Sequence, residues 1–208
     1  MSPWDADLVV LVADGNMYSA MQGLLSRPES LGIRSVRFNI FVHVERDPGC
    51  FLRGHDFLRP MANRYAHGLL LFDRMGSGQE VQEKEALERT VNDRLANTGW
   101  GDRAAAIVLD PELEVWVWSD SPEVDRCLGW KGQPHDLRGW LGNQGLWPHG
   151  SSKPGNPKRA VELALRQMNK PRSSSIYIQL AKSVSLQKCT DPAFNSFKEI
   201  MKKWFEKR

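Results

Sequence analysis

The sequence predicts an α/β fold in which a mostly parallel sheet is flanked by helices and followed by a helical C-terminal portion. Short, continuous apolar runs occupy residues 8–12, 69–72 and 104–109, which is typical of strands buried on both faces. Segments with helical periodicity separate these runs. Such an alternation of strands and helices favours a parallel sheet with helices on both faces. The 208 residues, 41% of them hydrophobic, suit one domain with an appendage.

The first half of the chain supplies most of the predicted elements in order. A turn at 13–16 follows the first apolar run, and apolar residues then recur at helical spacing over 17–25. The alternating segment 36–42 predicts a strand exposed on one face. Further predicted elements are a helix over 51–65 interrupted by Pro60, a buried run over 67–73, a glycine loop over 74–78 and an amphipathic helix over 79–97.

The second half divides into three parts. The run 104–109 ends the α/β core, which we expect over 1–118, and 115–118 continue as a helix or a strand. Residues 119–157 are rich in Gly, Pro and Trp and predict an irregular insertion. Residues 158–208 predict a basic helical portion packing on the core, with helices over 158–169, 176–187 and 192–206.

Charge is distributed unevenly along the chain. Residues 1–150 carry 15 basic and 21 acidic side chains, a net charge of −6, whereas residues 151–208 carry 13 and 4, a net charge of +9. A basic tail on an acidic body has two interpretations. It binds a polyanion, usually DNA or RNA, or it docks on the acidic half of its own chain. The candidate phosphate-binding side chains are Lys153, Lys158, Arg159, Arg166, Lys170 and Arg172.

Targeting and redox signals are weak. The three cysteines, Cys50, Cys127 and Cys189, are widely spaced and form no CxxC pair, which favours reduced thiols in a cytoplasmic protein. The N-terminal segment lacks a basic region, and the apolar run at 8–12 is too short for a signal peptide or a membrane span. We therefore expect a soluble, cytoplasmic protein without membrane contact.

Acidic residues follow the three buried runs. Asp14 follows the first run, Asp73 ends the second, and Asp110, Glu112 and Glu114 follow the third. Ligand sites in open α/β sheets form beyond the carboxyl ends of the strands, and converging carboxylates there favour Mg²⁺ (or Mn²⁺) with oxygen ligands. We therefore take all five as candidate metal ligands. The alternative is that these residues cap helices or form turns.

Two other features carry weaker signals. The polar segment 43–50, with His43, Glu45, Asp47 and Cys50, has the residue types of a metal or nucleophile site but no specific spacing. Trp116, Trp118, Trp130, Trp140 and Trp147 lie close together in sequence. They suit base stacking, but packing of the insertion or an interface with another protein is the favoured interpretation.

One segment carries a family resemblance. Residues 110–116, Asp-Pro-Glu-Leu-Glu-Val-Trp, together with 69–73 and the segment 189–194, Cys-Thr-Asp-Pro-Ala-Phe, resemble Toprim-related families of unknown function from bacterial defence islands. The methylation-associated defence systems are the nearest resemblance. The resemblance implies a Toprim-like, Rossmann-like fold, a role in antiphage defence and other defence proteins as partners.

The resemblance is incomplete at the expected metal ligands. Toprim domains carry a glutamate after the first strand and Asp-x-Asp after the third, but Ala13 and Met75 stand at two of these positions, and only Asp73 fits without adjustment. Glu114 is the preferred second acid, because Pro111 is well placed to open a helix.

Two functional hypotheses follow. In the first, Asp73 and Glu114 are the catalytic residues of a Mg²⁺-dependent nuclease or related phosphoryl-transfer enzyme, Asp14 assists, and the basic residues hold the nucleic acid. In the second, a catalytically degenerate Toprim-like scaffold binds partner proteins of a defence complex through the tryptophan-rich insertion. The replaced acids favour the second hypothesis, and the remaining acids favour the first.

Overall fold

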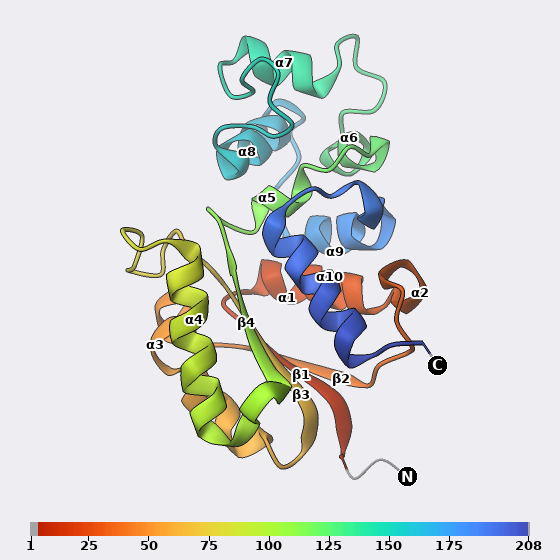
Figure 1. Cartoon of the computed structure of the whole chain (residues 1–208). Helices are drawn as coiled ribbons and strands as arrows, with labels where there is room; N and C mark the ends of the chain where they lie inside the picture. The colour runs from red at the N-terminus through yellow and green to blue at the C-terminus, as the bar shows by residue number, and fades with distance from the viewer. Residues whose placement is uncertain (1–3, 208) are drawn as a thin grey trace.

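The computed structural model, which describes residues 4–207, contains one four-stranded sheet with all strands parallel and the order β2-β1-β3-β4 (Figure 1). The strands are β1 (Ala6–Val12), β2 (Phe38–Val42), β3 (Tyr65–Asp73) and β4 (Ala104–Leu109). The predicted α/β class is confirmed, and the sheet is parallel throughout.

Helices cover both faces of this sheet (Figure 1). In the first half they are α1 (Gly15–Leu25), α2 (Pro28–Leu31), α3 (Arg46–Leu58), α4 (Lys84–Leu95) and the short turns η1 (Arg59–Met61), η2 (Ala96–Trp100) and η3 (Gly101–Arg103). In the second half they are α5 (Glu114–Val117), α6 (Pro122–Leu128), α7 (Leu137–Asn143), α8 (Pro157–Gln167), α9 (Ser174–Ser183), η4 (Leu186–Lys188) and α10 (Pro192–Trp204). Helices α3 and α4 pack on one face, and α1 and α10 pack on the other.

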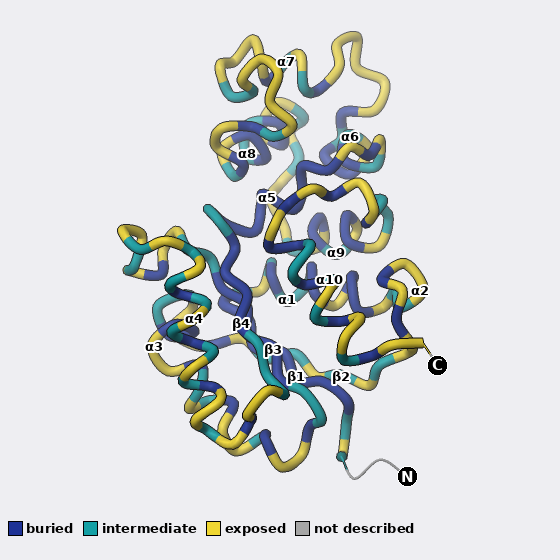
Figure 2. Tube along the Cα trace, viewed as in Figure 1, coloured by how far each residue is buried: buried dark blue, intermediate teal, exposed yellow. Residues whose placement is uncertain are grey.

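Burial follows position in the sheet. The central strands β1 and β3 are largely buried, whereas β2 at the sheet edge has only intermediate and exposed residues (Figure 2). Residues 8–12 have no exposed surface, as expected for a strand with helices on both faces. The continuous apolar runs therefore mark the centre of the core, and the alternating run marks an edge strand.

Several predicted boundaries were wrong. Helix α3 begins at Arg46 and ends at Leu58, earlier than the predicted 51–65, because Pro48 in the first turn needs no N–H partner. Gly49 is also required there, since a Cβ atom would lie 2.2 Å from Nδ1 of His43. The segment 79–83 is not helical, so the helix predicted over 79–97 is shortened to α4.

The region predicted to be irregular, residues 119–157, contains two helices. Ser121 caps α6 through a side-chain bond to the amide of Glu123, and Asp136 caps α7 through a bond to the amide of Gly139. Both helices have only seven residues. The glycines and prolines around them are typical of loops, so the sequence did not predict these helices. Together with α8 they lie beyond the carboxyl ends of the strands (Figure 1).

Helix α9 packs closely along α1. A Cβ atom built on Gly23 would lie 2.6 Å from Cβ of Ala181 and 2.9 Å from the carbonyl oxygen of Ile178, so this glycine lets the two backbones approach. Arg27 adds hydrogen bonds from its guanidinium to the carbonyls of Ala181 and Val184, at 2.8 and 2.9 Å. The C-terminal portion is thus joined to the α/β core along this helix pair.

Candidate functional site

Acidic side chains from several elements converge at the carboxyl edge of the sheet. Asp73 ends β3, and its backbone amide donates to Oδ1 of Asp47 at 2.8 Å. Oδ1 of Asp73 in turn accepts from the amide of Leu113 at 2.9 Å. Asp73 therefore ties the start of α3 to the segment that follows β4.

Neighbouring acids affect the pKa values of Asp73 and Asp47. Burial, followed by the charges of Asp47, Glu114, Asp14 and Glu112, raises the pKa of Asp73 well above its ordinary value. Burial also raises the pKa of Asp47, with a further contribution from Asp14, against the opposing amide bond from Asp73. These five acids form one cluster, here called the acidic edge.

The two most buried acids of the acidic edge already have cationic partners. Glu112, 8% exposed, accepts from Nζ of Lys158 at 2.9 Å. Glu114, 2% exposed, accepts from the guanidinium of Arg172 at 2.5 Å and from the hydroxyl of Tyr177. Buried carboxylates require such compensation, and here the C-terminal portion supplies it.

The buried acids also raise the pKa values of the side chains that bond to them. Burial, followed by the charge of Glu114 and the hydrogen bond to it, raises the pKa of the Tyr177 hydroxyl. Although burial opposes the effect, Tyr177 and Glu114 raise the pKa of the Arg172 guanidinium. The hydrogen bond to Glu112 likewise raises the pKa of Lys158. Both cations are therefore charged at neutral pH.

Residues 112–116, here called the clamp, join the C-terminal portion to the α/β core. Its residues Glu112, Glu114 and Trp116 point to three different C-terminal partners. Nε1 of Trp116 donates to Oδ1 of the buried Asp191 at 2.9 Å, as Glu112 and Glu114 bind Lys158 and Arg172. The i, i+2, i+4 pattern thus joins the end of β4 to α8, the loop before α9 and the start of α10.

Pro111 does not open a helix. It follows Asp110 in a cis peptide bond, and α5 begins only at Glu114. Because 112 and 113 lie outside the helix, Glu112 and Glu114 can both face the C-terminal portion.

Two predicted metal ligands have other roles. Asp110 is directed to Arg74, whose Nε donates to Oδ1 at 2.8 Å, and its side chain is 39% exposed. Asp110 therefore does not join the acidic edge. Asp14 caps α1, because its Oδ1 accepts from the amide of Met17 at 2.8 Å, as the helix-cap interpretation predicted.

These contacts decide whether a divalent cation could bind at the acidic edge. Within residues 4–207, no group of three or more His, Cys, Asp or Glu side chains is arranged to hold a metal ion. Glu112 and Glu114 are directed to cations of the chain, and Asp110 is directed away. The carboxylates in this arrangement do not fit a Mg²⁺ or Mn²⁺ site.

Most of the predicted phosphate-binding residues are engaged within the chain. Lys153 donates to the carbonyl of Val115 at 2.8 Å, and Lys170 donates to that of Cys127 at 2.5 Å, while Lys158 and Arg172 bind the acidic edge. Only Arg159 and Arg166 of the six are exposed without a side-chain partner among residues 4–207.

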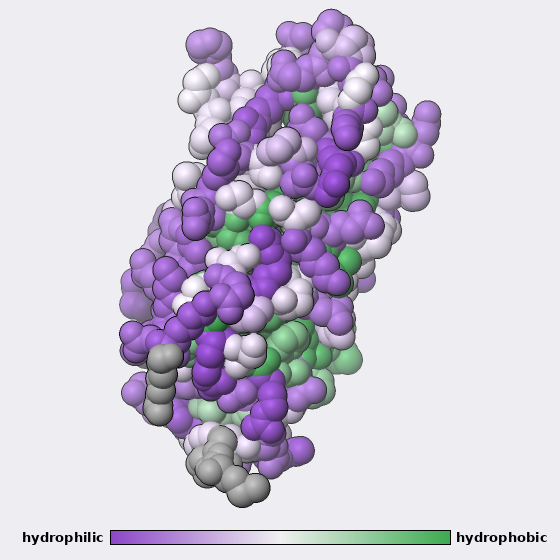
Figure 3. All heavy atoms as spheres, turned by 90° about the vertical axis from the view of Figure 1, so that its right-hand side faces the viewer, coloured by the Kyte–Doolittle hydropathy of each residue, from purple (hydrophilic) through white to green (hydrophobic). Residues whose placement is uncertain are grey.

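The surface on the side of α2 and the C-terminal end is largely hydrophilic, with scattered hydrophobic patches (Figure 3).

The tryptophans pack the interior. Trp116, Trp118 and Trp130 are buried, and Nε1 of Trp118 donates to the carbonyl of Pro157 at 3.0 Å. Trp140 and Trp147 are partly buried against Trp130 and Trp118, with ring centroids 4.7 and 5.4 Å apart. These five tryptophans are part of the hydrophobic core. They do not suit stacking on nucleic-acid bases, because a base needs an exposed ring face.

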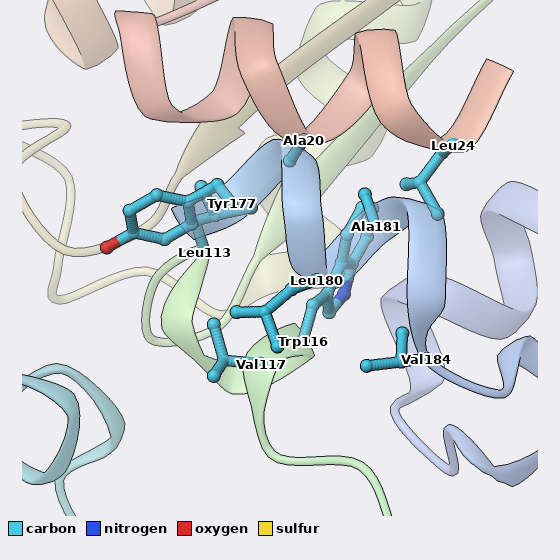
Figure 4. A pocket seen from close by; sticks show the side chains of 9 residues that line it. All are labelled: Ala20, Leu24, Leu113, Trp116, Val117, Tyr177, Leu180, Ala181 and Val184. Carbon is cyan, nitrogen blue, oxygen red and sulfur yellow. The ribbon is translucent and has the colours of Figure 1, made fainter. Parts of the chain in front are cut away.

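A small cavity of about 40 Å³ lies between α1, α5 and α9 (Figure 4). Apolar side chains line it almost completely, and the hydroxyl of Tyr177 points away from the other lining residues. It has room for about one water molecule and no polar groups to hold one. The cavity lies beside the acidic edge, because its lining residues Leu113 and Tyr177 donate to Asp73 and Glu114, and its apolar lining offers no site for a charged ligand.

Two members of the site, Asp47 and Tyr177, have no specific sequence signal. Asp47 lies in the polar segment whose signal was weak, and only its contact with Asp73 reveals its position. Tyr177 lies on the apolar side of a predicted helix, where an aromatic residue is ordinary, so no local signal distinguishes it.

Comparisons with known proteins add no assignment. No family model, curated protein or solved structure matches this chain. Among the described residues, none of the helices has the length and apolar character needed to cross a bilayer.

Proposed function

We propose that this chain is a Toprim-like scaffold that binds partner proteins of a bacterial antiphage defence complex and has lost metal-dependent catalysis. The observation that carries the proposal is the double ion pair of Glu112 with Lys158 and Glu114 with Arg172. These acids hold the basic C-terminal portion in place, which gives them a structural role.

The sequence supports the same proposal. Ala13 and Met75 stand where the resemblance implies metal-binding acids, and loss of carboxylate ligands weakens a Mg²⁺ site. The assignment to a defence complex rests on the resemblance of segments 69–73, 110–116 and 189–194 to the Toprim-related families.

A metal-dependent nuclease is the second candidate. It is favoured by the gathering of Asp14, Asp47 and Asp73, with the pKa of Asp73 raised by its neighbours, which is common at functional sites. For this function Lys158 and Arg172 would have to leave Glu112 and Glu114, so that more carboxylates become free. Arg159 and Arg166 would then be the first contacts for DNA or RNA phosphates.

Titration calorimetry with Mn²⁺ distinguishes the two functions. The scaffold proposal predicts no binding heat at millimolar metal for the wild type or Asp73→Asn, no cleavage of DNA or RNA, and a stable complex on co-expression with proteins of the same defence operon. Stoichiometric Mn²⁺ binding that Asp73→Asn abolishes and the control Asp110→Asn retains would establish the nuclease candidate instead, particularly if cleavage followed the same pattern.

A further inference from the structure

The outer edge of β2 has unpaired backbone groups. In the pairing with β1, the carbonyl of Arg37 accepts from the amide of Leu8 at 3.1 Å, and the amide of His43 donates to Val12 at 2.9 Å. Backbone groups alternate in direction along a strand, so those of the odd-numbered residues face β1 and those of Phe38, Ile40 and Val42 face outward. Across residues 4–207, no second strand pairs with β2.

The opposite edge of the sheet is protected. On β4, the amide of Ala106 donates to Oδ1 of Asn92 at 2.8 Å, and the amide of Val108 donates to Oε1 of Glu88 at 3.0 Å. Side chains of α4 thus satisfy donors that would otherwise be free. Proteins also protect edges with Lys, Pro or bulges, and residues 38–44 contain neither Lys nor Pro. The edge of β2 is therefore open to pairing with a further strand.

The apolar positions of this strand are arranged symmetrically about Ile40. Phe38 precedes Ile40 and Val42 follows it at the same spacing. These three residues share one face of the strand, and Val42 is 40% exposed. An apolar strand that is symmetric about its centre is complementary to itself in the antiparallel direction.

We propose that two copies of this chain associate through their β2 edges, in antiparallel register with Ile40 opposite Ile40, and so form a continuous eight-stranded sheet. In this register, Phe38 lies opposite Val42 of the partner subunit. All three opposed pairs are then outward-facing residues, so each pair exchanges both N–H···O bonds.

Charges at the two ends of the strand are compatible with a second copy as the occupant. The exposed Arg37 precedes the strand and the exposed Glu45 lies in the turn after it, so an antiparallel partner brings the basic end of one copy toward the acidic end of the other. Within the chain, these residues pair with Asp7 and Arg53. An isologous interface needs one self-complementary patch, which the symmetric strand provides. The proposal is independent of the acidic edge and of any metal.

Sedimentation equilibrium of the full chain tests the association. The expected result is a mass twice the 23.6 kDa of one chain. Val42→Lys places a charge on the exposed edge and is expected to raise the dissociation constant by about tenfold or more. Val81→Lys makes the same change at a residue that is 96% exposed in the loop between β3 and α4, and it is expected to leave the dimer intact.

Cross-linking tests the register. Opposed residues of a hydrogen-bonded antiparallel pair have Cα atoms about 5.5 Å apart, within the range for a disulfide. Ile40→Cys is therefore expected to form an intersubunit disulfide under mild oxidation, and Val81→Cys is not. Cys50, Cys127 and Cys189 are buried, so the background is low.

Several results would overturn the proposal. A monomeric wild type at all accessible concentrations would exclude the dimer. A dimer that is unaffected by Val42→Lys, or an Ile40→Cys chain that is dimeric and folded by circular dichroism but does not cross-link, would place the interface or the register elsewhere.

Discussion

Removing the cation that pairs with the buried Glu114 should strongly destabilise the C-terminal portion. The guanidinium of Arg172 binds Glu114 at 2.5 Å and Glu162 at 3.0 Å, and so joins the end of β4 to α8. In Arg172→Ala the carboxylate of Glu114, which is 2% exposed, keeps only the hydroxyl of Tyr177 as a side-chain partner among residues 4–207.

The magnitude follows from that burial. Breaking a buried ion pair by removing one partner costs about 3–5 kcal/mol. The side chain of Arg172 is 32% exposed and the tyrosine bond remains, so we expect about 3 kcal/mol, at the low end of that range. For a chain of this size, 1 kcal/mol corresponds to roughly 2–4 °C in Tm. The expected fall in Tm is therefore roughly 6–12 °C.

Urea unfolding of three variants checks this prediction. Arg159→Ala removes an exposed arginine of α8 without a side-chain partner and should change stability by less than about 0.5 kcal/mol. Adding Glu114→Gln to Arg172→Ala removes the uncompensated charge and should recover part of the loss. If Arg172→Ala were as stable as Arg159→Ala, the assignment of the clamp as the link between core and C-terminal portion would be refuted.

Three further changes probe the acidic edge and the packing around it. Asp73 has a higher pKa folded than unfolded, so between these values the folded state retains a proton that the unfolded state has lost, and stability falls as pH rises. Asp73→Asn should therefore be more stable than wild type at pH 7 and equal to it below roughly pH 4 in thermal melts. Gly23→Ala should cost about 1–3 kcal/mol in urea unfolding, because its Cβ would lie 2.6 Å from that of Ala181. Trp116→Phe should cost about 1–3 kcal/mol, because it removes a donor from the buried Asp191.

Matched variants make these results interpretable. Asp110→Asn removes a carboxylate that is ion-paired outside the acidic edge and should not reproduce the pH effect of Asp73→Asn. Gly142→Ala adds a Cβ at ordinary contact distance in α7, 3.6 Å from the nearest heavy atom, so it should not be destabilising. Trp140→Phe loses no Nε1 hydrogen bond among the described residues. Equal effects of each variant and its control would contradict the corresponding explanation.

Local sequence determined the centre of the fold. The apolar runs at 8–12, 69–72 and 104–109 became β1, β3 and β4, because only a strand covered on both faces needs continuous hydrophobicity. The alternating run at 36–42 became the half-exposed β2 at the edge. The same runs predicted that the acids following them lie at one end of the sheet, because parallel strands all end on the same side.

Tertiary structure decided what those acids do. Lys158 and Arg172 lie 46 and 58 residues from Glu112 and Glu114 in sequence, and no local periodicity encodes such a pairing. The same holds for Asp47, which joins the cluster only because α3 begins earlier than its Pro-Gly pair suggested. Local patterns specify which residues must be buried, whereas the charge that compensates a buried carboxylate depends on which distant segment the fold brings beside it.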